Sequence, residues 1–298
     1  MYQKPDQALI DYKGYKWGRL NQVYRGPKPD LSRPYIACIG AAQTFGRYVE
    51  RPFPALLAEE LDIQVANFGA ASAGPGFFLR DAAVIEAASS AELCVIQVMS
   101  ARSLSNRLFK VQLSRNAQIE AVSKSLEALF PHIDFETFTY AHNMLNQIAE
   151  EDPDKFVAVE AELKAAWVAR TRVLLQSIQT RRVLFWFSER ETDEEVSGGA
   201  AGQALKYPQF VDQEMMDAVA PLVDRVVRCV TSTGMPQSLL RDGEAVLHTP
   251  FGLPVSENRY YPSPEMHAEA AKALTQPIRE LLASTAPCAA ARPTITTI

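Results

Sequence analysis

The chain has 298 residues, of which 47% are hydrophobic and 22% charged, and its 30 Lys and Arg against 35 Asp and Glu leave a formal charge of −5. This composition is that of an ordinary globular protein, and the length favours one large domain with an insertion over two equal domains. The mild acidic excess, without a long basic run, provides no electrostatic footprint for nucleic acid or for an anionic membrane surface.

Cysteine usage and the N-terminal residues indicate the compartment. Cys38, Cys94 and Cys229 lie in apolar runs, and no CxxC or Cys/His pair occurs, which argues against a zinc site or a disulfide framework. The first residues lack the apolar stretch of a signal peptide, and no apolar run approaches the ~20 residues that span a bilayer. A cytoplasmic protein is expected, and the sequence identifies no cofactor.

Residues 1–34 contain four tyrosines and Trp17 without the period of a helix or a strand. This pattern predicts an irregular N-terminal arm. Packing of its rings over the surface of the domain is the favoured interpretation, and stacking on sugars or bases is the alternative.

Residues 35–285 are predicted to form one α/β domain. Short runs that are apolar on both faces alternate with helical segments, which is typical of a doubly wound, parallel, five-stranded sheet. The five predicted strands are Tyr35–Ile39, Gln64–Phe68, Leu93–Met99, Arg182–Phe187 and Val226–Val230. Ligands of such sheets bind beyond the carboxyl ends of the strands, so the loops there are the candidate site.

The long gap between the third and fourth strands, about residues 117–181, predicts a helical insertion. Asp152 and Pro153 form a helix start, and an apolar stripe from Phe156 to Ile178 recurs at three- and four-residue steps. The stripe is assigned to internal packing, with a homo-oligomer interface as the alternative.

Two later segments are predicted to be loosely held. Residues 188–204 are polar and Gly-rich after a strand, which predicts a mobile loop over the site. Its acidic cluster, residues 193–195, is expected to be solvated, and no metal site is predicted. Residues 286–298 are predicted to be a loosely ordered tail.

The loop after the first strand, residues 40–46 (GAAQTFG), places small residues where a backbone bends sharply or approaches a ligand. It resembles the opening block of SGNH/GDSL hydrolases, in which a strand ends in Gly-Asp-Ser-x-Thr and the serine is the nucleophile. In that alignment Gly40, Thr44 and Gly46 match. Ala41 takes the Asp position, and Ala42 takes that of the nucleophile.

Two further loops resemble the next blocks of the family. Residues 67–76 (NFGAASAGPG) are similar to a block in which a glycine amide helps to hold the oxyanion, with Gly74 as the nearest candidate and Gly69 as the alternative. In residues 97–103 (QVMSARS) the family's oxyanion Asn is absent. Arg102, Ser103 and Asn106 are instead candidate donors to an anionic or hydroxyl-rich ligand, although a surface ion pair is an equal alternative for Arg102.

Residues 260–271 (YYPSPEMHAEAA) resemble the closing block, Asp-x-x-His before a helix. His267 occupies the position of the base, and Pro264 that of the Asp. The alternative for His267 is a structural, hydrogen-bonded histidine. Glu265 or Glu269 is a candidate to orient its ring, or to interact with the helix N-terminus.

The resemblance covers most of residues 35–283 and implies an SGNH-like, flavodoxin-like fold, but the hydrolase mechanism is not encoded at the usual positions. Ester hydrolysis needs a hydroxyl nucleophile beside a base, and Ala42 has no hydroxyl. One alternative is that Ser72 or Ser100 reaches His267. Another is a transferase with two bound substrates, in which His267 takes the proton of a sugar hydroxyl.

The sequence therefore favours two alternative functions, each with a carbohydrate or another polar small molecule as the ligand. The first is an enzyme that modifies a polysaccharide by acyl or similar group transfer, with His267 and Ser100 as catalytic residues. The second is a catalytically inert protein that binds a glycan as part of a surface structure or assembly. The residues predicted to form the pocket are Gly40, Ala42, Gln43, Thr44, Gly74, Arg102 and Asn106.

Overall fold

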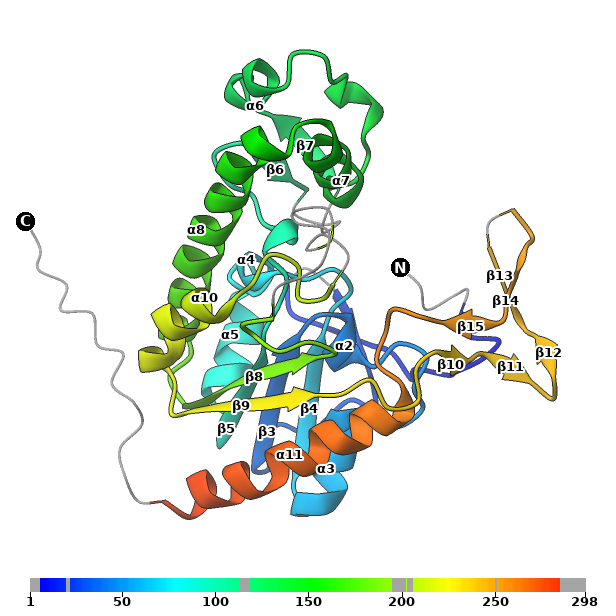
Figure 1. The fold of residues 1–298 in the computed structure, drawn as a ribbon. Helices are drawn as coiled ribbons and strands as arrows, with labels where there is room; N and C mark the ends of the chain where they lie inside the picture. Colours follow the sequence, from blue (N-terminus) through cyan, green and yellow to red (C-terminus); the bar gives the residue numbers. More distant parts are fainter. Residues whose placement is uncertain are drawn as a thin grey trace, which may run out of the picture.

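The computed structural model describes residues 6–19, 22–112, 118–194, 202, 206–249 and 251–284. A parallel sheet forms its centre, with strands β3 (Tyr35–Gly40), β4 (Gln64–Gly69), β5 (Leu93–Gln97), β8 (Arg181–Ser188) and β9 (Arg225–Val230). Their order is β4-β3-β5-β8-β9 (Figure 1), and each neighbouring pair is parallel. In chain order this is the 2-1-3-4-5 arrangement of flavodoxin-like sheets. The predicted fold class and all five strands are confirmed.

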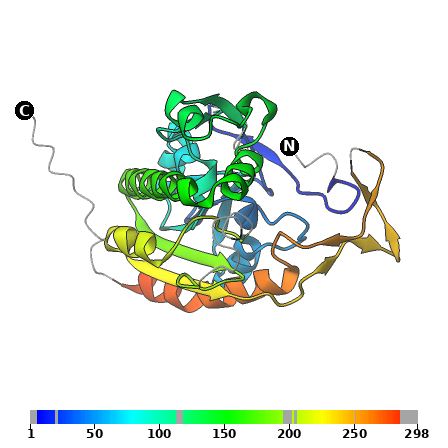
Figure 2. The same ribbon diagram turned by 45° about the horizontal axis from the view of Figure 1, so that its top comes forward.

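Helices cover both faces of the sheet, so successive residues of a strand pack on opposite sides. Ile36 and Cys38 of β3 share a core with α3 (Phe53–Leu61) and α11 (Pro264–Ala283). Ala37 and Ile39 belong to the core on the opposite face. The helices of that face are α4 (Pro75–Phe78), α5 (Ala82–Ser89), α8 (Pro153–Ser177) and α10 (Gln213–Val219). Figure 2 shows α8 and α11 on opposite sides of the sheet.

The insertion between β5 and β8 is only partly as predicted, because it contains strands as well as helices. Its elements are η1 (Ala101–Ser103), β6 (Phe109–Val111), β7 (Ile119–Val122), α6 (Lys124–Leu129), η2 (Phe135–Thr137), α7 (Ala141–Glu151) and α8. Strands β6 and β7 pair antiparallel. Runs of three and four residues are too short for their alternation to be recognised in a sequence.

Helix α8 begins as predicted and buries its apolar stripe within the chain. The Asp152 carboxylate accepts a hydrogen bond from the Lys155 amide at 3.1 Å, which satisfies an amide at the helix N-terminus. Phe156, Leu163 and Trp167 of the stripe are at most 1% exposed. The Trp167 indole donates to the carbonyl of Met99 at 2.7 Å, so this helix supports the loop that follows β5.

The N-terminal arm contains an antiparallel pair, β1 (Tyr15–Trp17) and β2 (Gln22–Tyr24), where an irregular segment was predicted. The prediction missed it because each strand has only three residues. The rings of the arm pack on the domain, as the favoured interpretation holds: the Tyr24 ring lies 5.3 Å from that of Phe68 and is buried.

Residues 237–258 project from the body as an arm of short strand pairs (Figure 1, right) that the sequence analysis did not predict. The pairs are β10 (Gln237–Ser238) with β15 (Glu257–Asn258), β11 (Leu240–Arg241) with β12 (Glu244–Ala245), and β13 (Leu247–His248) with β14 (Pro254–Val255). The remaining short helices are α2 (Ala42–Phe45) and η3 (Ala220–Leu222).

Parts of the predicted loop and the predicted tail lie outside the described residues, namely 195–201, 203–205 and 285–298. Among the helices that are described, none combines the length and the apolar character needed to cross a bilayer.

Candidate functional site

The loops after β3, β4 and β5 meet beyond the carboxyl ends of these strands, around a small cavity of about 50 Å³, here called the inner cavity. The crossovers of β3 and β5 leave in different directions, which makes this edge the usual ligand site of such a sheet. The residues that line the inner cavity are Ala41, Ala42, Gln43, Ser72, Ala73, Ser100, Arg102, Ser103, Tyr207, Gln209, Tyr260 and Tyr261.

Gln97, the last residue of β5, holds two walls of the inner cavity together. Its side chain is fully buried; its Oε1 accepts from the Ala41 amide at 2.9 Å, and its Nε2 donates to the Tyr207 hydroxyl at 2.7 Å. Only a glycine fits at position 40, because a Cβ there would lie 2.1 Å from Thr44 Oγ1 and 2.6 Å from Gln97 Oε1. The small residues of this loop therefore make room for a buried amide.

Two glutamines of the inner cavity carry carbonyl oxygens without a donor. Gln43 is 2% exposed and Gln209 is fully buried, and neither Oε1 has a hydrogen-bond partner among the described residues. A buried acceptor without a donor costs about 1–3 kcal/mol, so native proteins seldom keep one unless water or a ligand supplies the donor.

Donor groups lie next to these acceptors. The Tyr260 hydroxyl accepts from Arg102 Nη2 at 2.9 Å and from Gln209 Nε2 at 3.0 Å. Because it accepts twice, the hydroxyl still has its own proton to donate. The residues that line the inner cavity thus carry both unpaired acceptors and a hydroxyl proton free to donate.

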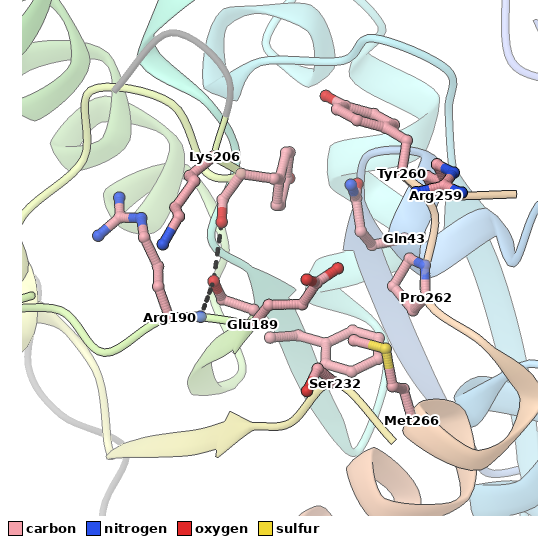
Figure 3. Close-up of a pocket in the computed structure, with 12 residues that line it drawn as sticks. Gln43, Glu189, Arg190, Lys206, Ser232, Arg259, Tyr260, Pro262 and Met266 are labelled. Carbon is pink, nitrogen blue, oxygen red and sulfur yellow. Dashed lines mark hydrogen bonds between the residues drawn. The ribbon is translucent and has the colours of Figure 1, made fainter. Parts of the chain in front are cut away.

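A larger cavity of about 330 Å³, here called the outer cavity (Figure 3), is lined by Gln43, Tyr207 and Tyr260, which also line the inner cavity. It lies beyond the ends of β8 and β9. Its other lining residues are Phe187, Ser188, Glu189, Arg190, Lys206, Ser232, Arg259, Pro262 and Met266.

His267 lies in the first turn of α11 and lines neither cavity. It is fully buried between α11 and α3, with its ring 6.1 Å from that of Phe53 and 5.4 Å from that of Phe187. Its Nδ1 accepts from the Phe53 amide at 3.1 Å, so the ring proton is on Nε2, which has no partner among the described residues. Burial lowers the pKa of His267 to about 3, and the charge of Arg25 acts in the same direction.

The predicted site residues are only partly brought together. Ala42, Gln43, Ser100 and Arg102 line the inner cavity. Ala42 is a buried methyl group there, and the Ser100 hydroxyl accepts from the Arg102 amide at 3.2 Å. Ser72, an exposed residue, also lines this cavity.

The other predicted site residues line neither cavity and make contacts within the loops in which they lie. Thr44 is fully buried, and its hydroxyl lies 3.3 Å from Gln97 Oε1. Gly74 begins helix α4. Asn106 Oδ1 accepts from the amides of Leu108 and Phe109, so its side chain stabilises its own turn. The Gly69 amide already donates to Asn67 Oδ1 at 2.8 Å.

The site residues predicted from the sequence did not include Gln97, Gln209, Tyr260 or Glu189. Gln97 had a usable signal, since a polar residue ends an otherwise apolar strand. Gln209 had none, because its place in the same cavity lining as Gln43 depends on the fold of the segment after β8. Within the described part of the chain, no three His, Cys, Asp or Glu side chains are grouped as a metal site would need.

A protein-family model described as a domain of unknown function, DUF6473, matches residues 1–282. The chain belongs to this family. No curated protein matches the sequence of this DUF6473 member.

Solved structures similar to this DUF6473 chain include SGNH hydrolases and carbohydrate esterases, all at low identity. A carbohydrate esterase family 2 enzyme with a carbohydrate-binding domain, from Corynascus thermopiles (Myceliophthora fergusii), is 13% identical over 89% of this chain and 70% of its own, with a TM-score of 0.44. The acetylxylan esterase Axe2 of Geobacillus stearothermophilus is 9% identical over 84% and 94%, with a TM-score of 0.40. A protein assigned to the SGNH hydrolases, from Slackia heliotrinireducens, is 15% identical over 82% and 98%, with a TM-score of 0.36.

Proposed function

We propose that this DUF6473 protein binds a hydroxyl-rich ligand of the carbohydrate class in the cleft formed by the inner and outer cavities, and that it does so without a serine–histidine hydrolysis step. The observation that carries the proposal is the pair of buried carbonyl oxygens, Gln43 Oε1 and Gln209 Oε1, that lack donors at the inner cavity.

The chemistry of the inner cavity favours hydroxyl groups over other ligands. A sugar hydroxyl donates one hydrogen bond and accepts two, so it can satisfy a glutamine carbonyl and receive a proton from a neighbouring donor at the same time. Tyr260 and Arg102 are such donors beside Gln209. The sequence resemblance to SGNH proteins implies the same ligand class independently of this geometry.

Two features argue against ester hydrolysis by a serine. Ala42, at the position of the nucleophile, offers only a methyl group. His267 lines neither cavity, and a histidine with a pKa of about 3 is a poor acceptor for a hydroxyl proton at neutral pH. A base has to lie within hydrogen-bond reach of the proton that it removes. The Nδ1 atom of His267 already accepts a hydrogen bond from the Phe53 amide.

The variant Gln43→Met tests the proposal, because it separates binding from stability. No hydrogen bond of the Gln43 side chain is formed with any described residue, so an apolar side chain of similar size should keep or raise the melting temperature. The affinity for a saccharide should nevertheless fall about tenfold, measured by isothermal titration calorimetry. The matched control is Gln276→Met at an exposed position of α11, which should leave the affinity unchanged.

The probes are oligosaccharides of xylose, glucose and N-acetylglucosamine, with and without O-acetyl groups. Binding of at least one saccharide, weakened by Gln43→Met but not by Gln276→Met, supports the proposal. It is refuted if none binds at millimolar concentration, or if the two variants have the same affinity.

A second candidate function is transfer of an acyl group to a carbohydrate hydroxyl. The observation that favours it is that the two cavities adjoin and share Gln43, Tyr207 and Tyr260, so that reacting groups bound in each would lie close together. With an acyl thioester as donor, the sugar oxygen would bond to the carbonyl carbon, the C–S bond would break, and the hydroxyl proton would leave with the thiol. Release of free thiol that depends on both substrates is the measurement that tests it.

A further inference from the structure

The outer cavity is lined by four charged side chains, and three of them are cations: Arg190, Lys206 and Arg259. By count alone the cavity would suit an anion. The ion pairs and hydrogen bonds of these side chains indicate instead that the charge left without a partner is negative.

Each of the three cations already has partners. Lys206 Nζ lies 2.8 Å from Glu194 Oε1, and Arg259 Nε donates to Glu257 Oε1 at 2.7 Å. Arg190 is 5% exposed, donates to the backbone carbonyls of residues 191, 208 and 211, and lies 5.0 Å above the ring of Trp186. In Figure 3 its guanidinium points away from the Glu189 carboxylate.

Glu189 is the charged group of this lining that lacks a partner in the described part of the chain. It forms neither an ion pair nor a hydrogen bond there, and its carboxylate points into the cavity, as Gln43 does (Figure 3). Glu189 is an exposed residue, and desolvation by the neighbouring walls still raises the pKa of its carboxyl, while Lys206 opposes this shift without cancelling it. No ion pair or hydrogen bond from the described residues therefore engages this carboxylate, which is left to water or to a ligand.

We propose that the outer cavity is a subsite for a positively charged amine of the ligand, with the Glu189 carboxylate as its counter-ion and Gln43 Oε1 as a second acceptor. This inference rests on the proposed carbohydrate binding and makes the ligand an amino sugar. An ammonium group has three N–H donors and no acceptor, which complements a carboxylate and an amide carbonyl that both lack donors. A cavity of about 330 Å³ is at the lower end of the usual range for small-ligand sites.

The test compares β-1,4-linked trisaccharides that differ only at the C2 substituent, which is an amine, a hydroxyl or an N-acetyl group. Affinities are measured by calorimetry on the full chain, at a pH below the pKa of the sugar amine. The wild-type protein should bind the amine form about tenfold more tightly than the hydroxyl form. Glu189→Gln should abolish this preference while the hydroxyl form still binds.

The matched control is Glu191→Gln, which removes the same charge two residues further along the loop, at a position that is exposed like Glu189 but lies outside the cavity lining. It should keep the amine preference. A glucuronic acid oligosaccharide tests the opposite assignment: tighter binding of this anion than of the amine would overturn the inference in favour of Lys206 and Arg259. Equal binding of the amine and hydroxyl forms would overturn it while leaving carbohydrate binding intact. If no saccharide binds the wild type, both proposals fall.

Discussion

His267 and Phe53 form a buried hydrogen bond that joins the first turn of α11 to the first turn of α3, with Nδ1 accepting from the Phe53 amide at 3.1 Å. The residue before Phe53 is Pro52, which has no side-chain group to cap α3. An amide at a helix N-terminus needs an acceptor from elsewhere, and the imidazole supplies it. The imidazole of α11 thus caps α3, a helix distant from it in the sequence.

His267→Ala is accordingly expected to weaken the fold. The variant leaves a cavity between two aromatic rings and removes the acceptor of a buried amide, for an expected loss of about 2–4 kcal/mol in the free energy of unfolding. Saccharide affinity should stay within about twofold, since the residue lines neither cavity. Urea denaturation and calorimetry measure the two quantities, and His132→Ala, at an exposed histidine, is the control. Unchanged stability with lost binding would contradict this role.

The same histidine should make stability depend on pH. Its pKa is about 3 in the folded protein against 6.5 as its ordinary value, so between these limits the unfolded chain binds a proton that the folded chain does not. Its contribution is therefore complete above pH 6.5 and is lost as the pH falls, by about 1.4 kcal/mol per pH unit. Unfolding free energies of the wild type and of His267→Gln should converge from about pH 6.5 to about pH 4.5. Parallel curves would show that His267 does not titrate in this way.

A hydroxyl introduced at Ala42, the position that the SGNH resemblance aligns with the nucleophile, should not create hydrolysis. Ala42→Ser places a serine at the inner cavity, but the histidine of the closing block lines neither cavity and has its Nδ1 engaged. Hydrolysis of p-nitrophenyl acetate should remain at the rate of the wild type. Ser100→Ala serves as the comparison, since Ser100 is the other hydroxyl predicted to act in catalysis. A hydrolysis rate that rises with Ala42→Ser and falls again with His267→Ala would show that the triad chemistry is latent in this fold.

Gly69→Ala should destabilise the loops that carry the site. A Cβ at this position would lie 2.2 Å from the backbone nitrogen of Phe45, so the end of β4 and helix α2 would have to move apart. The expected cost is about 1–3 kcal/mol, seen as a lower melting temperature. Gly76→Ala is the control, because the nearest atom to its Cβ is the end of the flexible Leu104 side chain at 3.3 Å. Equal melting temperatures of the two variants would contradict this account.

Much of the fold follows from local sequence patterns. Strands such as Tyr35–Gly40 are apolar on both faces, and this pattern is visible without knowing what covers them. The start of α8 was predictable because Asp152 and Pro153 act within one turn of chain. The strand pairs of residues 237–258 were not, because each strand has two residues and its pairing is decided by partners distant in the sequence.

For this protein, the sequence by itself determined the doubly wound sheet and the edge at which its loops meet. Apolar runs and turn residues act locally, so these features needed no knowledge of tertiary contacts. Only the tertiary structure decided that His267 is buried against Phe53, that Gln43 and Gln209 face one cavity, and that Glu189 lacks a partner. Burial and pairing of a polar side chain depend on which distant residues surround it, and the sequence around that side chain does not encode them.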